Sequence, residues 1–353
     1  MPVRHYLDHA ATTPLRPEAR EAMAAAMDIA GNPSSVHAEG RAAKGVVERA
    51  RAQVAEAIGA EADDIIFTSG ATEALALGLA GRGLACAPVE HEAALAWCEP
   101  SLEVSRDGRV TVPDPARATL QLANSETGIL QELPEGLALS DITQAFGKLP
   151  FAFGWSGISM AVISAHKFGG PKGVGALVLK PGTEVAARTL GGGQEMSRRA
   201  GTENMIGIAG MGAAAAAAQA DLANGVWEEV AARRNLLESA LEDEAPGLHI
   251  VGRTAPRLPN VTSVISPGWK GETQVMVMDL AGFATSAGSA CSSGKVRRSR
   301  VLEAMGYGDD AGCSLRISLG PDTTDDTVLA FARTFGEKRR RALGPARQTR
   351  MDA

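Results

Sequence analysis

The chain has 353 residues, which is too long for one compact core and suits two domains. Charged residues make up 22% and hydrophobic residues 45%, as in ordinary soluble globular proteins. The 35 basic and 41 acidic residues give a net charge of -6, which excludes the strongly basic composition typical of nucleic-acid-binding proteins. The most apolar stretch, Gly207 to Ala218, is too short to span a bilayer. We therefore expect neither a nucleic acid nor a membrane as a partner.

The first part of the chain alternates helical patterns with short apolar runs, which predicts an α/β fold. Helices are expected at residues 17–30, 41–58 and 73–79, the first of them opened by Pro17 and closed before Gly31. Strands are expected at residues 64–68, 84–89, 118–123, 136–140, 158–164 and 175–180. We predict that these strands form a mainly parallel sheet.

The second part of the chain has a different order of elements. A helical pattern from Asn204 to about Asp243 breaks near Asn224-Gly225, and it is interpreted as the connection between domains. Strands are expected near residues 260–266, 283–286 and 315–319, with helices between and after them. This predicts a large domain of residues 15–244 and a smaller α+β domain of residues 245–353, on which residues 1–14 pack.

The four cysteines, Cys86, Cys98, Cys291 and Cys313, include no pair with CxxC spacing. The first residues hold no apolar signal core, so we expect a reducing cytoplasm and no disulfide framework. Cys291 lies in a run of Gly, Ser and Ala, which predicts a mobile loop with an accessible thiol able to act as a nucleophile. Cys86 and Cys313 lie beside apolar runs and suit buried positions, and Cys98 receives no role.

Lys167 follows the predicted strand 158–164, in the segment Ser164-Ala-His166-Lys167. The carboxyl ends of parallel strands are where α/β folds bind ligands, and a lysine there can form a Schiff base with an aldehyde cofactor. Taken alone, a lysine at such a position is more often a solvated loop residue. Lys172 is its rival nearby, but it lies beside glycines and a proline and suits a turn.

Three further segments fit such a cofactor, although each has an ordinary structural alternative. Asp141 follows the predicted strand 136–140 and could hold a proton on a pyridine nitrogen, or could simply cap the following turn. The segment Thr68 to Glu73 could bind a phosphate at a helix N-terminus, or could be a plain N-capped helix. His91 could stack on a planar ring and move protons. His5 and His9 have i,i+4 spacing without metal partners nearby, so no metal site is expected.

An ordered set of motifs runs from Tyr6 to Leu319, nearly the whole chain. It comprises YLDHAATTP at 6–14, GNPSSVH at 31–37, SGATE at 69–73, EH at 90–91, NSETG at 124–128, DITQ at 141–144, SAHK at 164–167, RAGTEN at 199–204, GSAC at 288–291 and LRISLG at 315–320. Each motif is weak alone, but the ordered set resembles the cysteine desulfurases of the aminotransferase class V group. The SGSAC form resembles those members that have a long catalytic loop.

This resemblance implies a fold-type-I transferase that uses pyridoxal 5'-phosphate, and it assigns a role to each matching residue. Lys167 is expected to hold the cofactor, Asp141 to pair with the ring nitrogen, Gln144 to bond the ring hydroxyl and His91 to stack on the ring. The phosphate is expected to be held by Ala71, Thr72, Ser164 and His166, with Thr202 from a second subunit of a homodimer. Asn124 and Arg316 are expected to bind the substrate carboxylate, and Asn124 to contact the cofactor as well.

The resemblance also implies a reaction. L-cysteine would become L-alanine, with Lys167 moving the α-proton and the sulfur held as a persulfide on Cys291 before delivery to an acceptor protein such as an iron–sulfur scaffold. A selenocysteine lyase or an aminotransferase is an alternative within the same fold, although transamination needs no loop thiol. A non-catalytic relative that docks on sulfur-transfer partners is the alternative outside enzymes. The stretch between Thr72 and Asp141 is shorter than is usual in the family.

Overall fold

The computed structural model describes residues 4–288 and 298–344, so Cys291 lies outside the described residues. The strands are β1 (His5–Tyr6), β2 (Ile65–Thr68), β3 (Ala85–Cys86), β4 (Glu99–Pro100), β5 (Ser140–Asp141), β6 (Met160–Ser164), β7 (Gly175–Leu179), β8 (His249–Ile250), β9 (Val261–Ile265), β10 (Phe283–Ala284) and β11 (Ser314–Ser318). The α-helices are α1 (Pro17–Met27), α2 (Ala38–Ile58), α3 (Ala71–Leu79), α4 (Glu92–Leu95), α5 (Met205–Ala223), α6 (Val226–Glu244), α7 (Gly271–Leu280), α8 (Arg300–Ala304) and α9 (Asp325–Leu343).

The main sheet has the strand order β2-β7-β6-β5 and is mixed. β5 and β6 are parallel, but β7 runs antiparallel to both β6 and β2. Parallel bridges of Thr119 with Leu139 and of Ala85 with Ala118 continue the pairing beyond β5 toward β3. The α/β fold class is therefore confirmed, while the mainly parallel sheet we predicted is corrected to a mixed one by the direction of β7.

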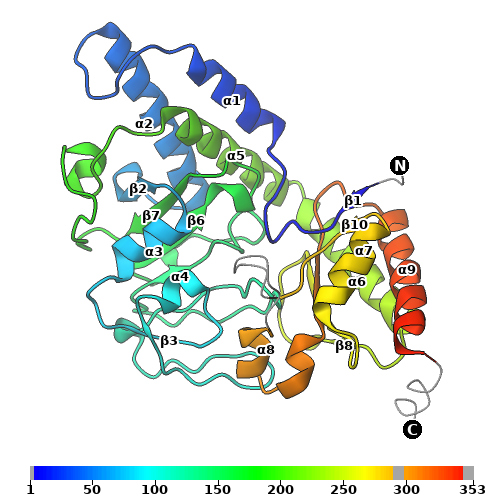
Figure 1. Ribbon diagram of the computed structural model, residues 1–353. Helices are drawn as coiled ribbons and strands as arrows, with labels where there is room; N and C mark the ends of the chain where they lie inside the picture. The colour runs from blue at the N-terminus through cyan, green and yellow to red at the C-terminus, as the bar shows by residue number, and fades with distance from the viewer. Residues whose placement is uncertain (1–3, 289–297, 345–353) are drawn as a thin grey trace.

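Every residue of β6 and of β7 is buried, which matches their continuous apolar sequences and requires cover on both faces. On one side the cover is the layer formed by α1, α2 and α5 (Figure 1). Small residues let these helices approach closely: a Cβ added to Gly212 of α5 would lie 2.6 Å from the Ala50 Cα of α2. The helices of this layer therefore pack closely through small residues, in agreement with the low aromatic content of the sequence.

α5 is longer than the apolar stretch 207–218 suggested. It has 19 residues and is long and apolar enough to cross a membrane by length and composition alone, so our argument from a short stretch was wrong. Half of its most apolar window is buried within the chain. Ile208, Met211 and Ala215 of this helix lie in the main core, and that position accounts for its apolar composition.

A second core lies in the other half of the molecule, around the sheet of order β11-β9-β8 and the helices α6, α7 and α9 (Figure 1). β1 pairs with β10 in parallel, and Leu7 lies in this second core, so the described start of the chain packs on the C-terminal elements. The helix break we expected is the turn between α5 and α6, where Gly225 has φ +74°. Val230, Leu237 and Leu241 of α6 lie in the second core. The division at residue 244 stays a prediction, although this packing groups α6 with the second core.

Candidate active site

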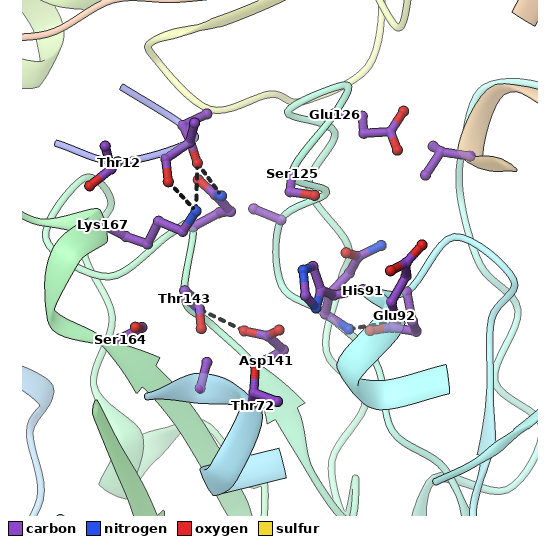
Figure 2. Close-up of a pocket in the computed structure, with 18 of the residues that line it drawn as sticks. Thr12, Thr72, His91, Glu92, Ser125, Glu126, Asp141, Thr143, Ser164 and Lys167 are labelled. Carbon is purple, nitrogen blue, oxygen red and sulfur yellow. Dashed lines mark hydrogen bonds between the residues drawn. The ribbon is translucent and has the colours of Figure 1, made fainter. Parts of the chain in front are cut away.

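A cavity of about 900 Å³ is lined both by residues at the end of the main sheet, such as Asp141 and Ser164, and by Arg316 of the second half of the molecule. It is lined by most residues that the sequence singled out, as Figure 2 shows for several of them: Ala71, Thr72, His91, Asp141, Gln144, Ser164, His166, Lys167 and Arg316. These residues come from separate elements, and the fold brings them to one place. Lys172 also lines the cavity, so it is a rival of Lys167 in position as well as in type.

Lys167 lies in a short 3-10 helix, Ala165–Lys167, directly after β6. Its side chain is half-buried, and its Nζ donates hydrogen bonds of 2.8 Å to the carbonyl oxygens of Ala10 and Ala11 (Figure 2). Both carbonyls belong to the N-terminal segment that packs on the second core. Lys172, in contrast, is exposed. The structure therefore fixes the amine of Lys167 inside the cavity and leaves that of Lys172 at its edge.

The N-terminus of α3 opens onto the same cavity. Its N-cap is Gly70 at φ +154°, a backbone conformation that favours glycine, and no side chain caps this end of the helix. A Cβ added to Gly175 of β7 would lie 2.7 Å from the Gly70 Cα, so this close packing requires glycine at position 175. Unused N–H groups at a helix N-terminus favour an anion.

His166 also lines the cavity, and its Nδ1 lies 3.2 Å from the Thr12 hydroxyl. Burial, together with the charges of Lys167 and Lys172, lowers the pKa of His166 to about 4. The ring is therefore neutral at neutral pH and offers one donor and one acceptor rather than a positive charge.

Asp141 and Gln144 line the cavity near the end of β5. The Asp141 Oδ1 accepts a 2.9 Å hydrogen bond from the Thr143 N–H, so the turn-capping role we considered is present together with the position in the cavity. The Gln144 amide donates to the Ala10 carbonyl at 3.0 Å, but its Oε1 is buried without a hydrogen-bond partner among the described residues. A buried polar atom without a partner marks a place where a bound molecule can complete the hydrogen bonding.

His91 is the N-cap of α4, where its Nδ1 accepts a 3.1 Å hydrogen bond from the Ala93 N–H. This bond orients the ring at the cavity wall (Figure 2) and leaves the proton on Nε2. The preceding residue, Glu90, is buried beside the same cavity, and burial raises its pKa well above the ordinary range. Burial therefore favours the neutral form of the acid that lies next to His91.

Arg316 of β11 reaches the cavity from the second half of the molecule. Its guanidinium donates to the Asp8 carboxylate and to the Ser125 carbonyl, each at 2.9 Å, and Asp8 also accepts from the Ser286 hydroxyl at 2.8 Å. The Arg316 Nε is buried without a partner among the described residues. This network holds a cation at the cavity wall, which suits recognition of a carboxylate.

Two described residues of the predicted site, Asn124 and Thr202, are not among those that line the cavity. Asn124 is buried, but its Oδ1 accepts from the Glu126 N–H, the Thr127 N–H and the Thr127 hydroxyl, and its amide donates to the Val89 carbonyl. Its side chain therefore shapes the turn 124–128, and its predicted contacts with cofactor and substrate are not tested. Thr202 is exposed, and Cys291 lies outside the described residues.

Sequence reasoning missed several cavity residues, including Glu126, Arg300 and Thr12. Glu126 lies within the motif 124–128, but nothing in the sequence indicates that its carboxyl meets Ser299. Lys148, next to the site, was also missed. It is only 2% exposed, and its Nζ donates a 2.8 Å hydrogen bond to the Gln144 carbonyl.

Lys148 yields a prediction about stability. Burial, followed by the charges of Lys167 and Arg16, lowers its pKa from 10.5 to about 7. Because the unfolded lysine keeps its ordinary pKa, the buried lysine costs stability in full below about pH 7, and this cost disappears as pH rises to about 10.5. Replacing it with methionine should stabilise the protein at neutral pH by on the order of 2 kcal/mol, after the lost hydrogen bond is counted.

Urea unfolding of the Lys148→Met variant and of the wild type, at the same cofactor loading, measures this effect. The advantage of the variant should shrink by about 1.4 kcal/mol per pH unit above roughly pH 7.5. The exposed Lys44→Met is the matched control and should show no such slope. A pH-independent difference between Lys148→Met and the wild type would contradict the assignment.

The described cysteines differ in their fitness as nucleophiles. A hydrogen bond with Cys98, followed by burial, raises the pKa of Cys86, which is fully buried. Burial also raises the pKa of Cys313. The pKa of Cys98 is lowered by its hydrogen bond with Cys86, so Cys98 is the strongest nucleophile of the three. Cys98 is not among the residues that line the cavity.

No group of three or more His, Cys, Asp or Glu side chains that could hold a metal occurs within residues 4–288 and 298–344.

A model of the family described as aminotransferase class V matches residues 5–112 and 109–331. The chain belongs to the aminotransferase class V family. The resemblance that the ordered motifs indicated is thereby confirmed.

The relatives of this class V chain include named enzymes. It is 36% identical over 360 residues to the cysteine desulfurase IscS of Dictyoglomus turgidum. The matched region covers 92% of this chain and 91% of that protein. It is 39% identical to a cysteine desulfurase of Cereibacter sphaeroides, with 86% and 87% covered. Among solved structures, a NifS-like protein from Rickettsia africae superposes with a TM-score of 0.87 at 31% identity, over 95% of this chain and 99% of that one.

Proposed function

We propose that this chain is a cysteine desulfurase that uses pyridoxal 5'-phosphate, converts L-cysteine to L-alanine and holds the sulfur as a persulfide on Cys291. The observation that carries the proposal is the position of Lys167, whose amine is held inside a cavity that also receives an uncapped helix N-terminus and a carboxylate. The similarity to named cysteine desulfurases supports the choice of reaction.

The residues present fit the cofactor at both of its ends. The α3 N-terminus, Ser164 and the neutral His166 suit a phosphate. The unpartnered Gln144 Oε1 lies buried where a ring substituent could complete its hydrogen bonding. Asp141 supplies a carboxylate for a protonated ring nitrogen, and the His91 ring supplies a flat surface at the wall.

Each residue then has a defined task. Pyridoxal phosphate, when bound, supplies an aldehyde for the substrate amine and a ring that accepts charge when the α-proton leaves. Lys167 holds the cofactor and then, as a free amine, takes the α-proton. Arg316 binds the substrate carboxylate with its guanidinium, which Asp8 orients. Asn124 contributes to the site by stabilising the turn 124–128.

The atoms and electrons of the sulfur-transfer step balance with the substrate and a thiol of this chain. The Cys291 thiolate attacks the sulfur of bound cysteine, so that an S–S bond forms as the substrate C–S bond breaks. The electron pair of that bond stays on the carbon skeleton, where a proton completes L-alanine. The net change is L-cysteine and one thiol to L-alanine and one persulfide, with no external oxidant required.

The remaining partners follow from this reaction. The persulfide sulfur passes to an acceptor protein with a thiol, such as an iron–sulfur scaffold.

Thr202 is exposed on a segment anchored by the buried Arg51–Glu195 ion pair. This position suits a residue that completes the phosphate site of a second copy in a homodimer. A fully active monomer in sedimentation experiments would contradict the dimer. A cytoplasmic location remains our expectation.

The proposal is tested by adding L-cysteine to the cofactor-loaded protein and following cofactor absorbance and alanine together. We expect an absorbance change and one alanine for each sulfur transferred. Formation of 3-mercaptopyruvate with loss of the original cofactor absorbance would indicate an aminotransferase. Turnover of selenocysteine but not of cysteine would indicate a selenocysteine lyase. An absence of cofactor absorbance, or of any product, would favour the non-catalytic alternative.

A further inference from the structure

Glu126 lies across the cavity from Lys167 and has no role in the function proposed above (Figure 2). Its place is fixed by the turn 124–128, since its own N–H donates to the buried Asn124 Oδ1 at 2.9 Å. The Gly128 that ends this turn has φ +73°, and a Cβ there would lie 2.9 Å from Val261. The turn therefore holds the Glu126 backbone rigidly against the second half of the molecule.

The Glu126 carboxyl contacts two residues that are far from Glu126 in the sequence. The Ser299 hydroxyl donates to its Oε2 at 2.5 Å, and Ser299 is 1% exposed. A Cβ added to Gly288 would lie 2.3 Å from the same Oε2, so the Gly288 backbone packs directly on the carboxyl. One carboxyl oxygen thus joins the residues at positions 288 and 299.

Ser299 is itself held by two further hydrogen bonds. Its Oγ accepts the Leu302 N–H at 3.0 Å as the N-cap of α8, and its backbone N–H donates to the Ala311 carbonyl at 3.2 Å. The charged groups that act on Glu126 are Arg316 of β11, Arg300 of α8 and Glu92 of α4. Burial is the largest influence and raises the pKa of Glu126. Whether charged or neutral, its oxygen can accept the Ser299 hydroxyl.

We propose that Glu126 is a positioning residue for sulfur transfer, because it fixes Gly288 and Ser299, which flank the segment that carries Cys291, at the wall of the cavity. The proposal rests on the proposed function. The three steps from Gly288 to Cys291 limit their Cα atoms to a separation of at most about 11 Å, because each residue extends at most about 3.6 Å. Anchoring Gly288 therefore limits the distance between Cys291 and the substrate site.

The test compares two steps in the cofactor-loaded protein. Glu126→Ala should slow persulfide formation on Cys291 about tenfold or more in a single turnover, because the buried Ser299 hydroxyl loses its acceptor. The absorbance change that reports L-cysteine binding should stay within about twofold of the wild type, since alanine keeps the backbone bond to Asn124 and removes only the carboxyl that meets Ser299. Glu126→Gln should restore most of the rate, because the amide oxygen still accepts from Ser299.

Two further variants complete the test. Ser299→Ala should be slowed as well, and the double variant should be no slower than the slower single one, because both remove the same bond. Glu132→Ala, an exposed glutamate outside this cluster, should behave as the wild type. A rate for Glu126→Ala equal to that of Glu132→Ala would overturn the proposal, and so would additive losses in the double variant.

Limited trypsin digestion without L-cysteine gives a readout that needs no turnover. Cleavage after Lys295, Arg297 and Arg298 should be several times faster in Glu126→Ala than in the wild type or in Glu126→Gln, because an anchored segment is cut more slowly. Equal cleavage rates would overturn the anchoring role. If the wild type forms no persulfide at all, the proposed function fails, and the digestion still decides whether Glu126 anchors this segment.

Discussion

Replacing Lys167 with alanine should abolish the bond to the cofactor that borohydride reduces, and should lower alanine formation by about a thousandfold or more. The structure gives the reason, because Lys167 is the lysine whose Nζ is held inside the cavity by two carbonyl oxygens. With alanine in its place, neither the covalent link nor the acceptor of the α-proton remains.

Lys172→Ala is the matched control for this experiment. Lys172 lines the same cavity and carries the same charge, but it is exposed. Its loss should leave the reducible bond in place and change turnover by less than about tenfold, because an exposed charge is screened by solvent and contributes little. If Lys172→Ala loses the bond and Lys167→Ala keeps it, the assignment of the two lysines is reversed.

Replacing Cys291 with serine should separate cofactor binding from sulfur transfer. None of the described groups that suit the ring or the phosphate belongs to residues 289–297, so the variant should bind the cofactor and respond to L-cysteine in its absorbance as the wild type does. Alanine formation should fall by about a thousandfold or more, because a serine hydroxyl is a far weaker nucleophile than a thiolate at neutral pH.

Cys98→Ser is the matched control for the thiol. Among the described cysteines, Cys98 has its pKa lowered, so it is the chemical rival of Cys291. It is not a lining residue of the cavity, and its replacement should leave alanine formation nearly unchanged. Loss of turnover in Cys98→Ser with retention in Cys291→Ser would show that the wrong thiol has been assigned.

The sequence predicted those parts of the fold that depend on local chemistry. Apolar runs located β6 and β7, and Asn224-Gly225 located the break between α5 and α6, where a positive φ favours glycine. Strand direction depends on long-range pairing, so the antiparallel course of β7 could not be read from its apolar residues. The run 118–123 was expected as a strand but makes only isolated bridges.

The candidate site was predicted largely through the ordered motifs, and the remaining residues depend on contacts that no motif contains. Glu126 meets Ser299 across 173 positions of sequence, and that bond forms only when the second half of the molecule closes on the turn 124–128. The Asn124 Oδ1 hydrogen-bonds within the turn 124–128, a contact that the motif does not reveal, and the ligand contacts expected of Asn124 stay predictions. Lys148 was missed because burial of a lysine follows from packing rather than from its neighbours in sequence.

The most direct test of the central claim is the mass of the cysteine-containing peptides after one turnover with L-cysteine. The account predicts one added sulfur atom on the peptide that contains Cys291, in amounts equal to the L-alanine formed. The peptides with Cys86, Cys98 and Cys313 should gain none, since the first is fully buried and the pKa of the third is raised by burial. Added sulfur on Cys98, or alanine released without added sulfur on Cys291, would contradict the account.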